Sequence, residues 1–417
     1  MGKVLWRVRW PSLVLAWATV WATVCVGVQA QEATAVRRLR ETRSCPGCNL
    51  QRASLGDAYL RSANLTAADL TDSDLSGADL RRASLRNADL QGVDLRHTNL
   101  EGANLEGANL EGALLTGTFF GDDIGQATLD PQWKMAWRMV NAPGTVADRE
   151  LTEAEFSLDG AQLSHSDLRG MVLTEIPLEG ADFSSSELAE AQLNRTNLQG
   201  SSFFAANLSQ ANLSESNLEG ADFTLATALG TDFTGAQLDA ADFSNAELAG
   251  AQLSQTSLRD SVFLSANLNQ ANLSASDLRN ADFAMATAVG SNFAGSDLDR
   301  ANFMQSALSQ ANFEDSLLRG ANFESADLSA ANLSRADLSN ANLESANLQG
   351  AQLLAARLER ARLTNADLRE ADLGEADLSL ADLSGANLLR ARLAAIRLYY
   401  TNLCNATMPD GSVRDCP

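Results

Sequence analysis

A large apolar residue recurs at every fifth position along most of the chain. These central positions hold Leu or Phe from Leu50 to Phe120 without exception, and from Leu158 to Leu403 with two exceptions. The residue two places before each centre is nearly always Ala, Ser or Thr, and the next is most often Asp or Asn. A helix repeats at about 3.6 residues and a strand at about 2, so a period of five would scatter apolar side chains around either. The pattern predicts a chain that turns a corner every five residues and points one large and one small side chain inward from each straight segment.

The phenylalanines predict how many segments make one turn of the coil. Twenty residues separate consecutive members of the series Phe183, Phe203, Phe223, Phe243, Phe263, Phe283, Phe303 and Phe323. Twenty residues are four pentapeptides, so we expect a square coil with these rings stacked on one face, about 4.8 Å apart. Phe233, Phe293 and Phe313 should lie on the opposite face. One coil buries too little apolar surface to be stable alone, so the array needs stacked neighbours and covered ends.

The two exceptions to the pattern are Ala228 and Ala288, which lie sixty residues apart in similar surroundings. A sixty-residue unit was therefore duplicated. In each copy the large residue comes one place later, at Leu229 or Val289, which predicts a local bulge. Two interpretations remain open: neighbouring Phe rings fill the space that Leu would take, or two shallow notches bind a ligand.

Composition excludes several classes of protein. The chain has 53 acidic and 31 basic residues and a formal net charge of −22. Its apolar fraction of 45% is too high for a disordered acidic chain, and five Cys are too few for a disulfide scaffold. Because basic patches supply the affinity of most nucleic-acid-binding proteins, we expect no direct nucleic-acid binding.

The first thirty residues read as a secretory signal peptide. Lys3, Arg7 and Arg9 precede an apolar run over 13–28, and the run ends in Val28-Gln29-Ala30. A charged start, an apolar centre and a small-residue cleavage site are the marks of an exported protein, although an uncleaved membrane anchor remains an alternative. The mature chain would carry 28 basic and 53 acidic residues, a net charge of −25, and no membrane span.

An insert divides the repeats, and it contains the two tryptophans that lie outside the predicted signal peptide. The predicted organisation is a signal peptide 1–30, an N-terminal linker or cap 31–44, a first array 45–120, a helical insert 121–157, a second array 158–403, and a C-terminal cap or tail 404–417. Asp130-Pro131 marks a helix start and 141–144 a stop, so Trp133 and Trp137 share one helical face. This short α-helix either covers the open end of a coil or docks a protein partner.

The repeated Ala-(Asp or Asn)-Leu triplets, such as Ala78-Asp79-Leu80, resemble the pentapeptide-repeat family. The resemblance implies an all-β solenoid, a right-handed quadrilateral β-helix with the central and small residues inward. Three local features are similar to members exported to the periplasm or thylakoid lumen of photosynthetic bacteria. They are Cys45-Pro46-Gly47-Cys48, the tail Thr407–Gly411 with Cys416, and the insert around Leu129–Trp137.

The cysteines offer the main candidate for redox chemistry. A thioredoxin-like enzyme would need a βαβ context and a thiolate at a helix N-terminus, whereas Cys48 occupies the small inward position of a repeat. If the arrays are collinear, Cys404 and Cys416 cannot reach Cys45 or Cys48, which also disfavours a four-cysteine zinc site. We therefore expect two local structural disulfides, Cys45–Cys48 and Cys404–Cys416, in agreement with export to an oxidising compartment.

No other motif predicts a catalytic residue, a cofactor or a metal. The Asp and Asn residues recur throughout the repeat, so we assign them to turns and surface solvation. The favoured function is a non-catalytic exported scaffold or protein-binding rod, with an unidentified protein partner and with a homo-oligomer left open. One alternative is DNA mimicry, because some pentapeptide-repeat proteins bind DNA gyrase; export opposes it. The second is a thiol–disulfide redox role for Cys45 and Cys48.

Overall fold

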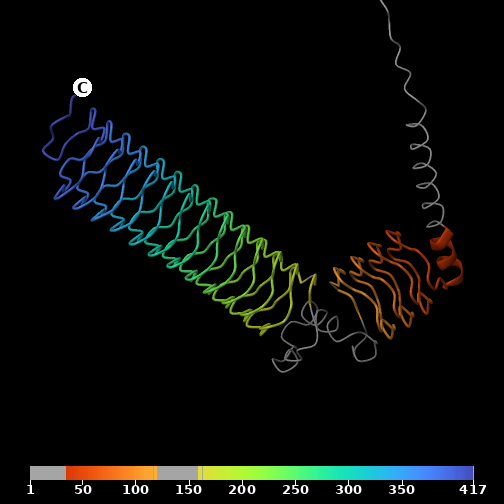
Figure 1. Cartoon of the computed structure of the whole chain (residues 1–417). Coiled ribbons are helices and arrows are strands. Elements are labelled where there is room, and N and C mark those ends of the chain that lie inside the picture. The colour runs from red at the N-terminus through yellow and green to blue at the C-terminus, as the bar shows by residue number, and fades with distance from the viewer. Residues whose placement is uncertain (1–33, 116, 120–157, 162, 417) are drawn as a thin grey trace, which may run out of the picture. The chain divides into compact units, whose positions relative to one another are not determined.

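Figure 1 shows a computed structural model of the chain, which describes residues 34–115, 117–119, 158–161 and 163–416. The chain divides into two compact units, Met1–Trp137 and Arg138–Pro417. The described part of the first unit holds the first array and that of the second unit the second array. The signal peptide expected at 1–30 and the insert expected at 121–157 lie outside the described residues.

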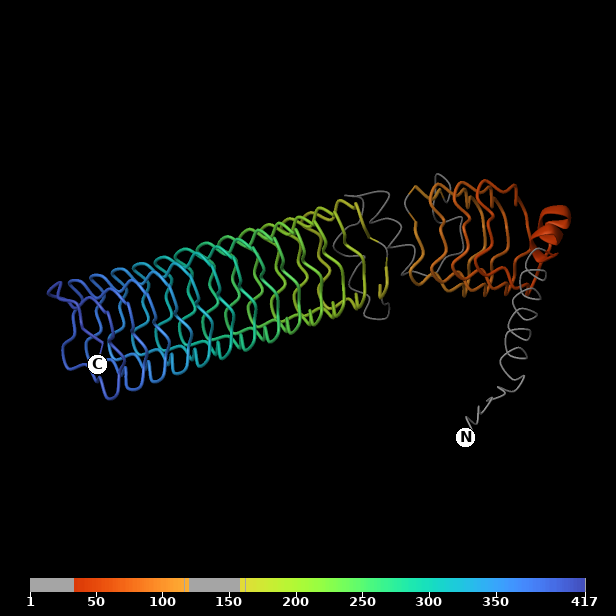
Figure 2. The same cartoon turned by 90° about the horizontal axis from the view of Figure 1, so that it is seen from above.

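Each array is a stack of coils that repeat every twenty residues (Figures 1 and 2). Asn64, for example, forms isolated parallel bridges to both Ser44 and Ser84. The backbone bonds in both directions along the stack: Asn64 N donates to Arg43 O at 2.8 Å and Leu65 N donates to Ser84 O at 2.8 Å. The period of four pentapeptides is thus confirmed. Among the described residues, one bridged residue in nearly every pentapeptide takes the place of a continuous strand.

A tight turn makes every corner of the coil. At most corners, the N–H three residues after a centre donates to the carbonyl of that centre, as from Ala63 to Leu60 at 3.0 Å. The residue before this donor takes a positive φ, 57° at Ser62, as a type II turn requires. The Asp or Asn before a centre accepts a bond from the turn: Thr71 N lies 3.2 Å from Asp69 Oδ1. The role in turns expected for these polar residues is confirmed.

The core consists of the central residues and the small residues two places before them. Rings from Phe183 to Phe323 stack at the twenty-residue spacing, with centroids 4.6–5.0 Å apart and planes within 6°. Phe233, Phe293 and Phe313 meet this stack edge to face at 5.6–5.9 Å. The predicted aromatic stack, its spacing and its opposite partners are confirmed.

The bulge predicted at the two central alanines is wrong. Ala228 is 0% exposed, and its N–H donates to Glu247 O at 2.7 Å, as the central leucines do to their own partners. The backbone at Ala288 is equally regular: Ala288 is 1% exposed, and its N–H donates to Ala307 O at 2.7 Å. The backbone ladder holds the register whichever side chain is central, and Phe223 and Phe233 meet edge to face beside Ala228. Both alanines are buried, so they form no notch for a ligand.

A helix over 34–42 covers the N-terminal end of the first array (Figures 1 and 2). Leu39 is fully buried, and the Arg40 guanidinium donates to Ser54 O in the coil at 3.1 Å. This helix shields an apolar coil end, as the ends of a repeat array require.

The C-terminal tail covers the end of the second array only in part. Thr407 forms an antiparallel bridge to Val413, which folds the tail back against the last coil. Leu398, Tyr399 and Tyr400 stay exposed there, by 37%, 71% and 90%. In the described ranges no helix is long and apolar enough to cross a membrane.

Candidate protein-binding surface

One face of the second array is almost free of charge over six consecutive coils. It is formed by the outward residues of 204–210, 224–230, 244–250, 264–270, 284–290 and 304–310, which we call the uncharged face. Each of the six coils contributes five outward positions to this face, and Glu247 is the one ionisable residue among the thirty positions. Its carboxylate accepts a bond from Asn267 Nδ2 at 2.7 Å. The face is clearly bounded, because Glu187 and Glu190 precede it and Glu324 and Asp327 follow it at the equivalent positions.

Large apolar side chains gather at the turns of this face. Phe204, Leu225, Leu229 and Met285 are 41%, 52%, 40% and 49% exposed. Leu264, Val289 and Met304 are half-buried. The core is complete without these residues, since its positions are filled by the centres and small residues. Few charges together with exposed aromatic and Met residues are typical of the centre of a protein–protein interface.

Two of these residues occupy turn positions that do not favour them. Leu225 and Met285 have φ of 60° and 57°, in the left-handed region where bulky residues are uncommon. Many turns of the same arrays carry Gly or a polar residue at this position. Backbone preference therefore does not explain Leu225 or Met285.

The surface pattern follows the sixty-residue duplication. Leu225 and Met285 are sixty residues apart, as are Leu229 and Val289. The polar contacts are duplicated too: Gln210 Nε2 donates to Leu229 O at 3.2 Å and Gln270 Nε2 donates to Val289 O at 3.3 Å. The uncharged face thus presents two similar apolar units, three coils apart.

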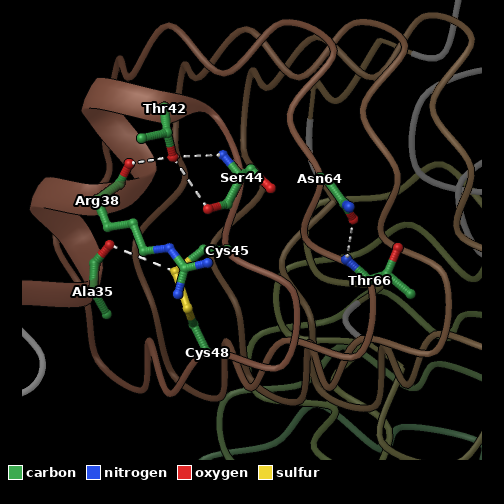
Figure 3. Close-up of a disulfide and its surroundings, with 8 residues drawn as sticks. All are labelled: Ala35, Arg38, Thr42, Ser44, Cys45, Cys48, Asn64 and Thr66. Atoms are coloured by element: carbon green, nitrogen blue, oxygen red, sulfur yellow. Dashed lines mark hydrogen bonds between the residues drawn. A yellow bond between two sulfur atoms is a disulfide. The ribbon is translucent and has the colours of Figure 1, made fainter.

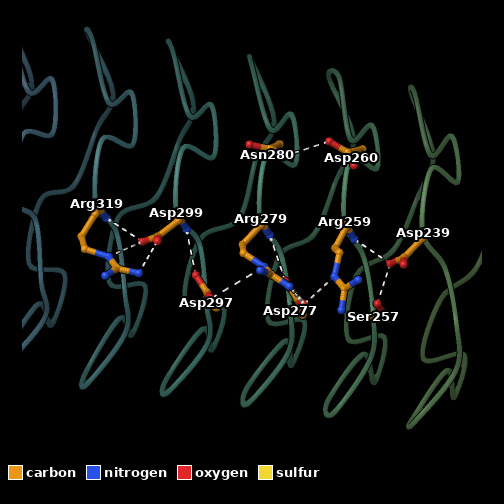
Figure 4. Close-up of polar contacts among 10 residues, drawn as sticks. All are labelled: Asp239, Ser257, Arg259, Asp260, Asp277, Arg279, Asn280, Asp297, Asp299 and Arg319. Carbon is orange, nitrogen blue, oxygen red and sulfur yellow. Dashed lines mark hydrogen bonds and ion pairs between the residues drawn. The ribbon is translucent and has the colours of Figure 1, made fainter.

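The opposite side of the same coils is strongly charged. Figure 4 shows arginines and carboxylates of successive coils in contact with one another along this side. Asp277 Oδ2 lies 2.6 Å from both Arg259 Nε and Arg279 Nη2, and Arg279 Nε is 3.8 Å from Asp297. Hydrogen bonds from Arg279, and then from Arg259, lower the pKa of Asp277 to about 2 against the opposing effect of burial. This side is an ordered ion-pair network.

A hollow of about 380 Å³ lies within this charged side. Its lining residues are Arg259, Arg279, Asn280, Asp299 and Arg300. Arg259 and Arg279 already bind Asp277, and Asp299 binds Arg319 (Figure 4). Its charges are largely compensated by one another, so the hollow is a weaker candidate than the uncharged face.

Cys45 and Cys48 lie together beneath the N-terminal helix (Figure 3). Their Cα atoms are 5.4 Å apart and their sulfur atoms are within bonding distance. Cys45 is fully buried, and its Sγ lies 3.7 Å from Ala35 O. The two cysteines follow the C-terminal end of helix 34–42 in the sequence. A catalytic thiolate is favoured at a helix N-terminus, so a position after the helix C-terminus favours a structural disulfide instead. A hollow of about 320 Å³ beside Cys48 includes Arg38 in its lining.

The other predicted site residues have different outcomes. Cys404 and Cys416 lie with their Cα atoms 4.5 Å apart and their sulfurs within bonding distance, so the structure brings both predicted pairs together. Trp133 and Trp137 lie outside the described residues. Where the structure describes side chains, no three His, Cys, Asp or Glu groups are arranged to hold a metal ion.

Two family models match the repeats. A model described as pentapeptide repeats matches residues 48–87, 78–117, 306–345, 321–360, 346–385 and 361–398. A model described as a pentapeptide repeat region matches residues 176–253 and 236–313. The matches together span more than half of the chain. The chain belongs to the pentapeptide-repeat family.

Solved structures of other pentapeptide-repeat proteins are similar to this chain. HetL from the cyanobacterium Nostoc sp., involved in heterocyst differentiation regulation, is 29% identical over 60% of this chain and 92% of its own, with a TM-score of 0.24. A protein of the Arabidopsis thaliana thylakoid lumen is 28% identical over 33% of this chain and 72% of its own, with a TM-score of 0.16. QnrB1, a plasmid-mediated fluoroquinolone resistance protein, is 19% identical over 49% of this chain and 92% of its own, with a TM-score of 0.25. No curated protein matches the chain.

The uncharged face was missed at the level of sequence. At the five-residue period its exposed apolar residues do not stand out from the polar residues of the other turns, because each turn contributes only one or two of them. Reading the same turns in steps of twenty aligns Phe204, Leu264 and Met304 on one corner. The signal was therefore present in the sequence at the coil period.

Proposed function

We propose that this protein is a non-catalytic, exported protein-binding rod built on a right-handed pentapeptide coil. The uncharged face carries this proposal. A chain with a net charge of −22 leaves thirty adjacent outward positions with one ionisable group, and exposes Phe204, Leu225 and Met285 there. Solvation alone favours charged residues on an exposed surface, whereas desolvation on binding a partner favours their absence.

The binding surface can be tested by photo-crosslinking from this face in the native cell. A photoreactive phenylalanine at Phe204, which is 41% exposed, should crosslink to protein. The matched control is the same group at Leu380, which is 47% exposed and outside the uncharged face. Equal crosslinking from both positions would contradict the proposal. Inhibition of gyrase supercoiling by the purified protein at micromolar concentration would instead favour DNA mimicry.

The proposed export rests on the charged start and apolar run of residues 1–30. Fused to a reporter that is active only outside the cytoplasm, these residues should give full activity. Replacing Leu15 and Val20 in the apolar run by Arg should abolish it, because an apolar centre is what the export machinery recognises. Retention of the fusion inside the cytoplasm, with no reporter activity, would reject export and remove the main objection to the gyrase alternative.

A further inference from the structure

We propose that the uncharged face binds the same face of a second copy of this chain, with the two arrays antiparallel. This inference rests on the proposed function, since it names the partner of the protein-binding surface. The contact has two-fold symmetry, so each copy contributes the same residues.

The charge distribution selects a second copy as the partner. Two molecules that each carry a net charge of −22 repel one another, and this repulsion is smallest where their carboxylates are fewest. The uncharged face provides such a place over six coils, between Glu187 and Glu190 at one end and Glu324 and Asp327 at the other. A basic partner, by contrast, gains most by binding the carboxylates elsewhere on the array.

The duplicated apolar units make the face complementary to itself. The two-fold axis lies in the plane of contact, at right angles to the long axis of the array, and passes through the middle of the six coils. It therefore sets the first coil of one copy against the last coil of the second copy. Phe204 then faces Met304 of the second copy, and Leu225 faces Met285 of the second copy. Both contacts occur twice because of the symmetry. The face covers itself over its full length, which is about 24 Å at about 4.8 Å per coil.

Glu247 distinguishes this arrangement from a parallel one. In a parallel two-fold dimer the two copies of Glu247 would face each other in the middle of a desolvated contact, where like charges are costly. In the antiparallel dimer Glu247 faces Asn267 of the second copy, the residue type that already donates to it within one chain at 2.7 Å. The single carboxylate of the face is thus compatible with the antiparallel contact alone.

Sedimentation velocity of the purified full chain tests the proposal. The wild type should be dimeric at micromolar concentration, and Leu225→Glu or Met285→Arg should each weaken the dimer by about 100-fold or more. The turn accepts both substitutions, because Glu215 and Arg195 occupy the same turn position with φ of 59°. Leu380→Glu is the matched control: its φ is 63°, it is 47% exposed, and it should remain dimeric.

Mixing the two variants tests the direction of packing. Leu225→Glu and Met285→Arg place opposite charges face to face in an antiparallel heterodimer, so the mixture should regain the dimer. A parallel dimer would instead be restored by mixing Leu225→Glu with Leu229→Arg, and that result would overturn the antiparallel arrangement.

The remaining outcomes separate this inference from the proposed function. A monomeric wild type, or a dimer that Leu225→Glu leaves intact, would overturn self-association through this face. If crosslinks from Phe204 to a different protein persisted in that case and were lost in Leu225→Glu, the uncharged face would still be a protein-binding surface. If those crosslinks were also unaffected, both proposals would fail.

Discussion

Phe243→Ala should lower the free energy of unfolding of the second array by about 3–5 kcal/mol, the usual cost of removing a buried aromatic ring. The Phe243 ring stacks on Phe223 at 4.6 Å and on Phe263 at 4.9 Å, and meets Phe233 edge to face at 5.9 Å. Its removal leaves a cavity that the neighbouring coils cannot close, because backbone bonds fix their separation. Urea unfolding followed by far-UV circular dichroism measures the loss.

Two matched variants locate the source of this effect. Tyr400→Ala removes an aromatic ring from a position that is 90% exposed and outside both the stack and the uncharged face, so it should change stability by about 0.5 kcal/mol or less. Phe243→Leu substitutes the residue found at most other centres and should cost less than about 1.5 kcal/mol. A loss below about 1 kcal/mol for Phe243→Ala would contradict the role assigned to the stack.

The loss should also be local along the array. Repeat proteins are stabilised mainly by contacts between neighbouring units, so coils near Phe243 depend on its ring more than distant coils do. Hydrogen exchange should rise first in residues 223–263 of Phe243→Ala, with the coils around Leu363 unchanged. Uniform exchange along the whole array would mean that the coils open together.

The coil could be predicted from sequence because one short period governs both its interior and its backbone. The spacing of Phe203, Phe223 and Phe243 specifies which residues stack, and the structure has them stacked. The predicted bulge at Ala228 failed for a related reason. The bonds that hold each coil come from the backbone, so a change of the central side chain alone does not displace the chain.

The ends and the surface were harder to predict, because neither follows the five-residue period. Helix 34–42 is too short for its apolar pattern to stand out, although the segment 31–44 was expected to be a linker or cap. Leu225 and Met285 lie at turn positions where the fold accepts many residue types, so the five-residue pattern contains no rule about them. Their shared face becomes visible when the chain is read at the twenty-residue coil period and the charges around these residues are mapped.

Loss of the Cys404–Cys416 pair should release the C-terminal tail from the last coil. The two residues are separated by 12 positions, and closing such a loop contributes about 3 kcal/mol in the chain-entropy model. Otherwise the tail is held by few backbone bonds, among them Asn405 N to Arg414 O at 2.8 Å. Val413 is 61% exposed, so burial of its side chain contributes little to holding the tail against the last coil.

Replacing both Cys404 and Cys416 by Ser should therefore raise hydrogen exchange in residues 405–414 and leave the central coils unchanged. The matched control replaces Cys45 and Cys48, whose separation of 3 predicts a smaller contribution of about 2 kcal/mol, confined to the first array. Peptide mapping of the wild type from an oxidising compartment should find all four thiols paired. Four free thiols, or a tail equally protected in both double variants, would show that folding of the tail is independent of the disulfide.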